Sequence, residues 1–141
     1  MALAPPIVGI GVRSVEAAAG GVTIPQYRVL VLLEDNGALS IGMIAFELGV
    51  NPSNATRVCD RLERLGLAER TSSAHDRRSV LVEVTDAGRA VVAAVTSYRR
   101  QEFARVVEQL GASGREALVH ALDEVTSAAR AVEGADLARK G

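Results

Sequence analysis

Residues 39–89 read LSIGMIAFELGVNPSNATRVCDRLERLGLAERTSSAHDRRSVLVEVTDAGR, and this stretch decides the fold. Its first half holds two apolar helical patterns separated by a three-residue turn. Gly49 can adopt the positive φ that ends a helix at a sharp corner, and Asn51-Pro52 has the composition of a helix start. We therefore expect helices over 41–48 and 52–65, joined as in a helix-turn-helix.

The second of these helices has one apolar and one polar face. At 100° per residue the apolar side collects Ala55, Val58, Cys59, Leu62 and Leu65. Candidate DNA-contacting residues in its first turns and on its polar side are Ser53, Asn54, Thr56, Arg57, Arg61 and Arg64. A helix that enters the major groove needs such a buried side and such a row of donors. An ordinary amphipathic surface helix has the same two faces, so this helix alone leaves both interpretations open.

A β-hairpin is predicted directly after this helix. Residues 80–85 alternate with period 2, and they can pair with residues 68–71 across the polar loop SSAHDRRS. Such a wing brings Arg77 and Arg78 near its tip, where an arginine can contact the DNA backbone or the narrow minor groove. Asp76 is expected to support the wing by orienting an arginine or accepting loop N–H groups. The alternative is a plain surface turn.

Further helical patterns flank the central stretch, over 7–19, 24–36 and 86–110 and from residue 113. In the last of them the apolar residues step by four and three, as in a helix that packs on another helix; they are Leu118, Leu122, Val125, Ala129 and Val132. We expect three parts. Residues 1–22 and 86–133 form flanking helices, of which the carboxyl-terminal ones carry a seam suited to dimerisation; residues 23–85 form the winged helix-turn-helix, and residues 134–141 form a loose tail.

Composition excludes several classes of protein. The chain has 141 residues, of which 48% are hydrophobic and 23% charged, as in a globular protein. No apolar run reaches the roughly 18 residues of a membrane span, and the first residues lack the basic region of a secretory signal. The single cysteine, Cys59, rules out an intramolecular disulfide and suits a reducing cytoplasm.

An enzyme is not expected either. Phosphate-loop, dinucleotide-binding, zinc-protease and serine-hydrolase motifs are absent from the sequence, and the two histidines lie far apart. We therefore predict no metal ion and no cofactor. Residues 51–89 carry seven basic and six acidic side chains, a net charge of +1, so DNA binding depends on where the arginines point.

The stretch from Ile24 through Gly88 resembles the MarR family (multiple antibiotic resistance regulators) of bacterial transcription factors. The resemblance rests on the string D-R-L-E-x-x-G-L at residues 60–67. It rests also on the wing signature D-x-R-x-x-x-[LV]-x-x-T, which begins at Asp76 and is followed by D-x-G-R at residues 86–89. The match runs without gaps through about 65 residues.

The resemblance implies a mainly α-helical protein with a small β-hairpin wing, in which the flanking helices of residues 1–22 and 86–133 form a helical dimerisation region. It implies a cytoplasmic, sequence-specific repressor that binds a pseudo-palindromic operator as a homodimer. By position, the first turns of the recognition helix would face the major groove and Arg78 the minor groove. Arg77 would pair with Asp60 or Asp76.

The resemblance also implies a small amphipathic or phenolic effector, bound between the dimerisation and DNA-binding regions. Tyr27, Phe46 and Tyr98 are the candidates to line its pocket, although at helical spacing core packing is the better explanation of each.

Two alternatives remain at this point. The winged helix can be a protein-interaction module that binds no DNA. The regulator can instead sense oxidation through Cys59, although this cysteine falls on the apolar side of its helix, where a cysteine usually acts as a small inert side chain.

Overall fold

The computed structural model describes residues 5–72 and 80–140, and the chain divides into two compact units at Gln101. The first unit contains α1 (Pro5–Ala18), α2 (Ile24–Asn36), β1 (Leu39–Ser40), α3 (Ile41–Leu48), α4 (Pro52–Arg64), β2 (Ala68–Ser72), β3 (Val80–Val84) and most of α5 (Asp86–Glu108). The second contains the end of α5 and α6 (Ala112–Lys140). The predicted helices are confirmed, with ends that differ by a few residues.

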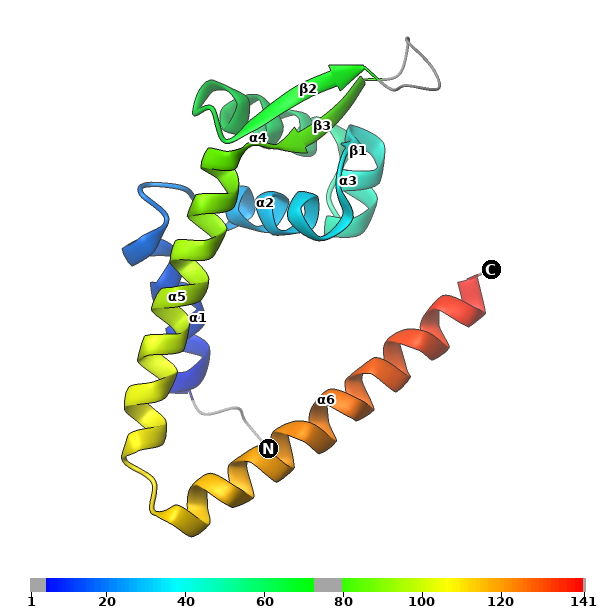
Figure 1. Cartoon of the computed structure of the whole chain (residues 1–141). Coiled ribbons are helices and arrows are strands. Elements are labelled where there is room, and N and C mark those ends of the chain that lie inside the picture. The colour runs from blue at the N-terminus through cyan, green and yellow to red at the C-terminus, as the bar shows by residue number, and fades with distance from the viewer. Residues whose placement is uncertain (1–4, 73–79, 141) are drawn as a thin grey trace. The chain divides into compact units, whose positions relative to one another are not determined.

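The core of the first unit is built from α2, α3 and α4, with the sheet beside them (Figure 1). Four large aliphatic side chains from these helices are completely buried: Leu30, Leu33, Ile44 and Leu62. Local signals start the helices. The Gln26 side chain accepts the Thr23 N–H at 2.9 Å ahead of α2, and Ser40 Oγ accepts the Met43 N–H at 3.2 Å ahead of α3.

The sheet has three antiparallel strands in the order β1-β3-β2. The predicted hairpin is β2 and β3, in a register that pairs Ala68 with Val84 and Ser72 with Val80. Its inner face buries Val82 and Val84. The strand β1 is not in the sequence prediction, because two residues cannot show a period-2 pattern. It becomes a strand only by pairing with β3.

The start of α5 is fastened to the turn that follows α4. Thr85 Oγ1 donates to the Gly66 carbonyl at 2.7 Å and accepts the Gly88 N–H at 3.2 Å, which caps the helix. Gly88 lies so close to this turn that an added Cβ would be 2.2 Å from the Leu67 carbonyl oxygen and 2.7 Å from Val84 Cγ2. Residue 88 therefore has no room for a side chain unless the backbone moves.

In the second unit, α6 extends further than the sequence predicts. The expectation of a loose tail from residue 134 is wrong, because the helix runs on to Lys140. A single glycine inside a helix costs only about 1 kcal/mol, and Gly134 is followed by residues that mostly favour helix. Among the described residues, no helix is both long enough and apolar enough to cross a lipid bilayer.

Replacing Gly88 by alanine should lower the free energy of unfolding by roughly 1–3 kcal/mol, because the new methyl group overlaps backbone that cannot move away cheaply. Urea denaturation followed by circular dichroism measures the change. Gly42→Ala in α3 is the matched control, since the nearest atom to its added Cβ is Ser40 Oγ at 3.9 Å. An equal stability of the two variants would contradict the packing described for residue 88.

Candidate nucleic-acid interface

The turn between α3 and α4 is short and held by local hydrogen bonds. Gly49 has φ = 65° and ψ = 35°, the left-handed conformation that ends α3, and the Val50 N–H donates to the Ala45 carbonyl at 3.0 Å. Asn51 Oδ1 accepts the Asn54 N–H at 2.8 Å and caps α4. The chain therefore turns from one helix into the next within three residues, which fixes the direction of α4.

Burial separates the two faces of α4. Ala55, Cys59 and Leu62 are at most 1% exposed, so they hold the helix on the core. The opposite face presents Ser53, Arg57, Arg61 and Arg64 as exposed residues, with Asn54 and Thr56 half-buried beside them. The six residues that the sequence singles out on this helix thus form one polar surface, rich in donors and with three guanidinium groups.

Several of these side chains already hold local hydrogen bonds. Ser53 Oγ donates to Asn51 Oδ1 at 2.7 Å, and Thr56 Oγ1 donates to the Pro52 carbonyl at 2.9 Å. Arg57 donates to the Asn54 side-chain oxygen. A base edge or phosphate that binds here must compete with these bonds, whereas Arg61 and Arg64 form no ion pair with a described residue.

An arginine that the sequence analysis passed over ties the wing to α4. Arg70 of β2 pairs with Asp60 and, at 2.7 Å, with Glu63. Asp60 and Glu63 are the two carboxylates of the D-R-L-E string, so these pairs join the hairpin to α4. Spacing alone could not find this contact, because Arg70 lies ten residues from Asp60 and on a different element. The side chains are about one-third exposed, so each pair contributes only a few tenths of a kcal/mol to about 1 kcal/mol.

The predicted wing residues Asp76, Arg77 and Arg78 lie outside the described residues. The structure therefore gives Asp60 a partner in Arg70 and does not bear on its pairing with Arg77.

Cys59 is 1% exposed at the centre of the α4 core face. The pKa of its thiol is raised to about 11, chiefly by burial; Arg70 lowers it in part, and the nearby Asp60 and Glu63 add to the rise. Since the thiolate is the reactive form, Cys59 stays protonated and unreactive near neutral pH. This argues against oxidation of Cys59 as the signal.

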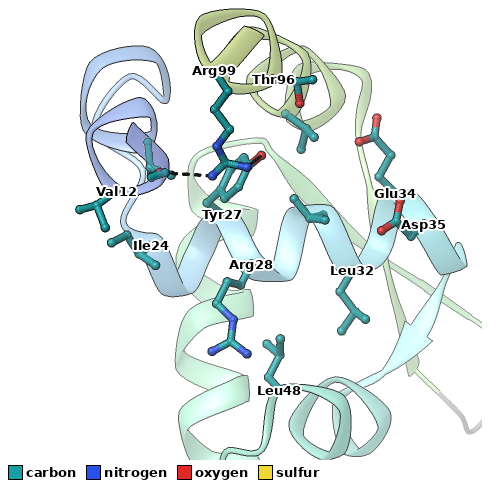
Figure 2. Close-up of a pocket in the computed structure, with 14 residues that line it drawn as sticks. Val12, Ile24, Tyr27, Arg28, Leu32, Glu34, Asp35, Leu48, Thr96 and Arg99 are labelled. Carbon is teal, nitrogen blue, oxygen red and sulfur yellow. Dashed lines mark hydrogen bonds between the residues drawn. The ribbon is translucent and has the colours of Figure 1, made fainter. Parts of the chain in front are cut away.

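A cavity of about 710 Å³ lies between α1, α2 and the first part of α5 (Figure 2). Of the three aromatic residues considered for an effector pocket, only Tyr27 lines it. Phe46 is 69% exposed on α3, and Tyr98 is half-buried but not part of the wall. Helical spacing shows on which face of its own helix each residue lies. It does not show which of these faces packs against α1. Although rich in glycine and alanine, α1 supplies part of the wall through Gly11, Val12 and Val15.

Arg99 occupies one side of this cavity and was not a sequence candidate. Its Nε donates to Ser14 Oγ at 2.8 Å, and its guanidinium carbon lies 5.1 Å from the centre of the Tyr27 ring. Weaker contacts of 3.4 Å reach the Tyr27 hydroxyl and the Gly11 carbonyl. All these partners are neutral, so the guanidinium charge is held in place by dipoles and an aromatic face rather than by a carboxylate.

In both sequence and structure, the chain is similar to known transcriptional regulators and their relatives. A family model described as MarR family matches residues 20–79. The HTH-type transcriptional regulator YfiV of Bacillus subtilis is 33% identical over 113 residues, which cover 80% of this chain and 69% of YfiV. The HTH-type transcriptional repressor MdtR of Bacillus subtilis is 37% identical over 90 residues, 64% of this chain and 58% of MdtR. The crystal structure of RV1404 from Mycobacterium tuberculosis superposes with a TM-score of 0.80 at 40% identity, covering 88% of this chain and 84% of that one.

Alkylation of Cys59 tests its state directly. With a pKa near 11, the thiol of the folded protein should stay almost unreactive toward iodoacetamide up to about pH 10. The unfolded protein in urea should react from about pH 8.5, the ordinary value for cysteine. Mass spectrometry of samples quenched at each pH measures the modified fraction. Rapid alkylation of the folded protein at pH 7 would contradict the burial and restore the redox alternative.

Proposed function

The chain belongs to the MarR family, whose members are HTH-type, DNA-binding transcriptional regulators rather than enzymes, and we propose that it represses transcription as a ligand-responsive homodimer. The observation that carries the proposal is the two-faced α4. Its buried side is Ala55, Cys59 and Leu62, and its outer side carries a stripe of arginines. The repressor MdtR supports the proposed sign of regulation. A repressor works where the genes are, so the proposed compartment is the cytoplasm.

In this proposal the first turns of α4 contact base edges, and its later turns contact the phosphates of the DNA backbone. Ser53, Asn54, Thr56 and Arg57 face the major groove, where hydroxyl, amide and guanidinium groups discriminate between bases. Arg61 and Arg64 contact phosphates, which adds affinity that falls as salt rises. The wing arginines Arg77 and Arg78 follow the adjacent backbone and minor groove.

The proposed dimer rests on apolar side chains that a single chain leaves exposed. On α6, Val119 is 60%, Leu122 54% and Val125 64% exposed. Surface helices of monomers rarely show such a row, and a second copy of the same helix would cover it. A two-fold axis then demands an operator with two inverted half-sites, about 34 Å apart from centre to centre.

The proposed effector site is the cavity between α1, α2 and α5. Its volume of about 710 Å³ lies within the range of small-molecule sites. Its wall combines aliphatic side chains with the Tyr27 ring and the Arg99 guanidinium, a lining that suits a small amphipathic molecule. A ligand there contacts both α2 of the DNA-binding part and α1 and α5, so it can bias the spacing of the recognition helices.

Two arginine substitutions on α4 should have different effects on DNA binding. Arg57→Ala should lose roughly 1–3 kcal/mol of discrimination between specific and unrelated duplexes, because it removes a base contact. Arg61→Gln should weaken binding to both duplexes and lower the slope of log K against log salt by about 2, because the homodimer loses one phosphate contact at each half-site. Fluorescence anisotropy at several salt concentrations measures both quantities.

Arg100→Gln, on an exposed position of α5, is the matched loss of one charge away from α4 and should change neither quantity. Wild-type affinity and salt slope in both α4 variants would exclude α4 as the DNA-binding helix and favour the protein-interaction module.

A charge placed in the exposed apolar row of α6 should break the dimer. Leu122→Glu should sediment as a monomer at micromolar concentration, since a carboxylate cannot be buried unpaired in an apolar interface. DNA affinity should fall by about a hundredfold, because the two half-sites are no longer bound by one molecule. Ser127→Glu adds the same charge at an exposed polar position of α6 and should remain dimeric. Dimeric Leu122→Glu with unchanged helix content would contradict this interface.

A further inference from the structure

The outer side of α3 exposes a cluster of apolar side chains. Phe46 is 69% exposed, more than any other large apolar residue that the structure describes, and Met43 is 46% exposed one helical turn before it. Val50, also exposed, follows in the turn to α4. Figure 1 shows α3 at the outer edge of the first unit. These three residues, Met43, Phe46 and Val50, form what we call the α3 patch.

Folding of the first unit does not explain the α3 patch. The opposite side of α3 packs Ile44 and Ala45 into the core, where they are at most 3% exposed, so the helix is held in place without Phe46. Phe46 does not line the cavity between α1, α2 and α5 either. Single exposed apolar side chains are common on protein surfaces, but a group of neighbouring ones marks a contact with another molecule.

The size of the α3 patch limits this contact to a weak one. Three such side chains cover on the order of 300 Å². A stable protein–protein interface buries about 800 Å² on each partner. The patch therefore cannot hold two molecules together in dilute solution. It can act where another attachment already keeps the partner close, because two proteins bound to one DNA have a local concentration on the order of millimolar.

The position and the charge of the α3 patch favour a second copy of this chain as the partner. Val50 lies three residues before Ser53, so the patch borders the proposed DNA-binding face of α4. Two palindromic operators side by side generate a local two-fold axis between them, about which the same surface of two dimers meets. An apolar surface can face its own copy, whereas like charges oppose such a contact. Glu47 is the only charged residue of α3, so little repulsion opposes it here.

We propose that the α3 patches of two dimers bind one another when the dimers occupy neighbouring operators on one DNA. The side chains of Phe46 and Met43 pack across the local two-fold axis, and DNA binding becomes cooperative. This inference rests on the proposed function, since it needs a dimer that binds DNA through α4. It adds an interface between dimers, separate from the exposed apolar row of α6 that forms the proposed dimer itself.

A duplex that carries two copies of one operator tests the cooperativity. Gel-shift titration separates the singly and doubly bound complexes, and a series of duplexes moves the operator centres apart in half-turn steps. At the best spacing the doubly bound complex should exceed the amount expected for independent binding roughly tenfold, since only a small surplus remains after the costs of association. The excess should vanish half a turn away, about 5 base pairs, because the patches then lie on different sides of the DNA.

Two substitutions test whether the α3 patch causes the cooperativity. Phe46→Gln should bind a single operator as tightly as the wild type but bind two operators independently. It is a neutral change at an exposed position, so it alters neither the charge nor the core. Leu65→Gln removes an exposed apolar side chain of the same unit outside the patch and should stay cooperative. Cooperative binding by Phe46→Gln, or independent binding by the wild type at every spacing, would overturn the proposal.

A measurement without DNA separates this inference from the proposed function. The chain has two methionines, so labelling of the methionine methyl groups gives a simple NMR spectrum, in which Met43→Leu identifies the Met43 signal. In the wild type this signal should shift between micromolar and millimolar protein, because the Phe46 ring of a second copy approaches it. In Phe46→Gln it should not shift.

The two measurements fail in different ways. If the Met43 signal shifts and no duplex binds, the proposed function fails and the contact between the patches stands. If DNA binds, the signal does not shift and two operators are bound independently, the contact fails and the proposed function stands.

Discussion

The burial of one face of α4 is the constraint on which the rest of the structure depends. Ala55, Cys59 and Leu62 are held against the side chains of α2 and α3, which include Leu30 and Ile44, both 0% exposed. Rotation of α4 about its axis would bring arginines into this core, where an unpaired charge is very unfavourable. Packing therefore directs the arginine stripe outward, and the orientation of this proposed DNA-binding face follows from the apolar residues as much as from the polar ones.

Two further contacts fix the elements around α4. The pairs of Arg70 with Asp60 and Glu63 join β2 to the helix, and Gly88 lets α5 approach the Leu67 backbone closely. The D-R-L-E and D-x-G-R strings thus have a structural basis, since they join the wing to α4 and the long helix α5 to the turn that follows α4. A displacement of α5 by a ligand in the large cavity would act on α4 through this turn.

The helices of the first unit could be predicted from the sequence because the signals that start and end each helix lie within a few residues of its ends. The side chains of Ser40 and Asn51 cap the starts of α3 and α4 with hydrogen bonds, and Gly49 ends α3 by adopting left-handed backbone angles. The two-residue β1, the Arg70 pairs and the position of Arg99 depend on chain segments that meet only in the folded protein, and the sequence analysis missed them. For the same reason, the sequence could not show that Phe46 and Tyr98 lie outside the wall of the cavity between α1, α2 and α5. The exposed polar face of α4 was predicted in full, because one helix contains both its buried and its outer residues.

The central claim is that two copies of α4 read two related half-sites. Selection of duplexes from a random library by the purified full chain, followed by sequencing, tests it most directly. The account predicts enrichment of an inverted repeat whose half-site centres lie about 10 base pairs apart, since a two-fold dimer presents its recognition helices one DNA turn apart. Enrichment of a single unrepeated motif would contradict the dimeric reading, and no enrichment at all would contradict sequence-specific DNA binding.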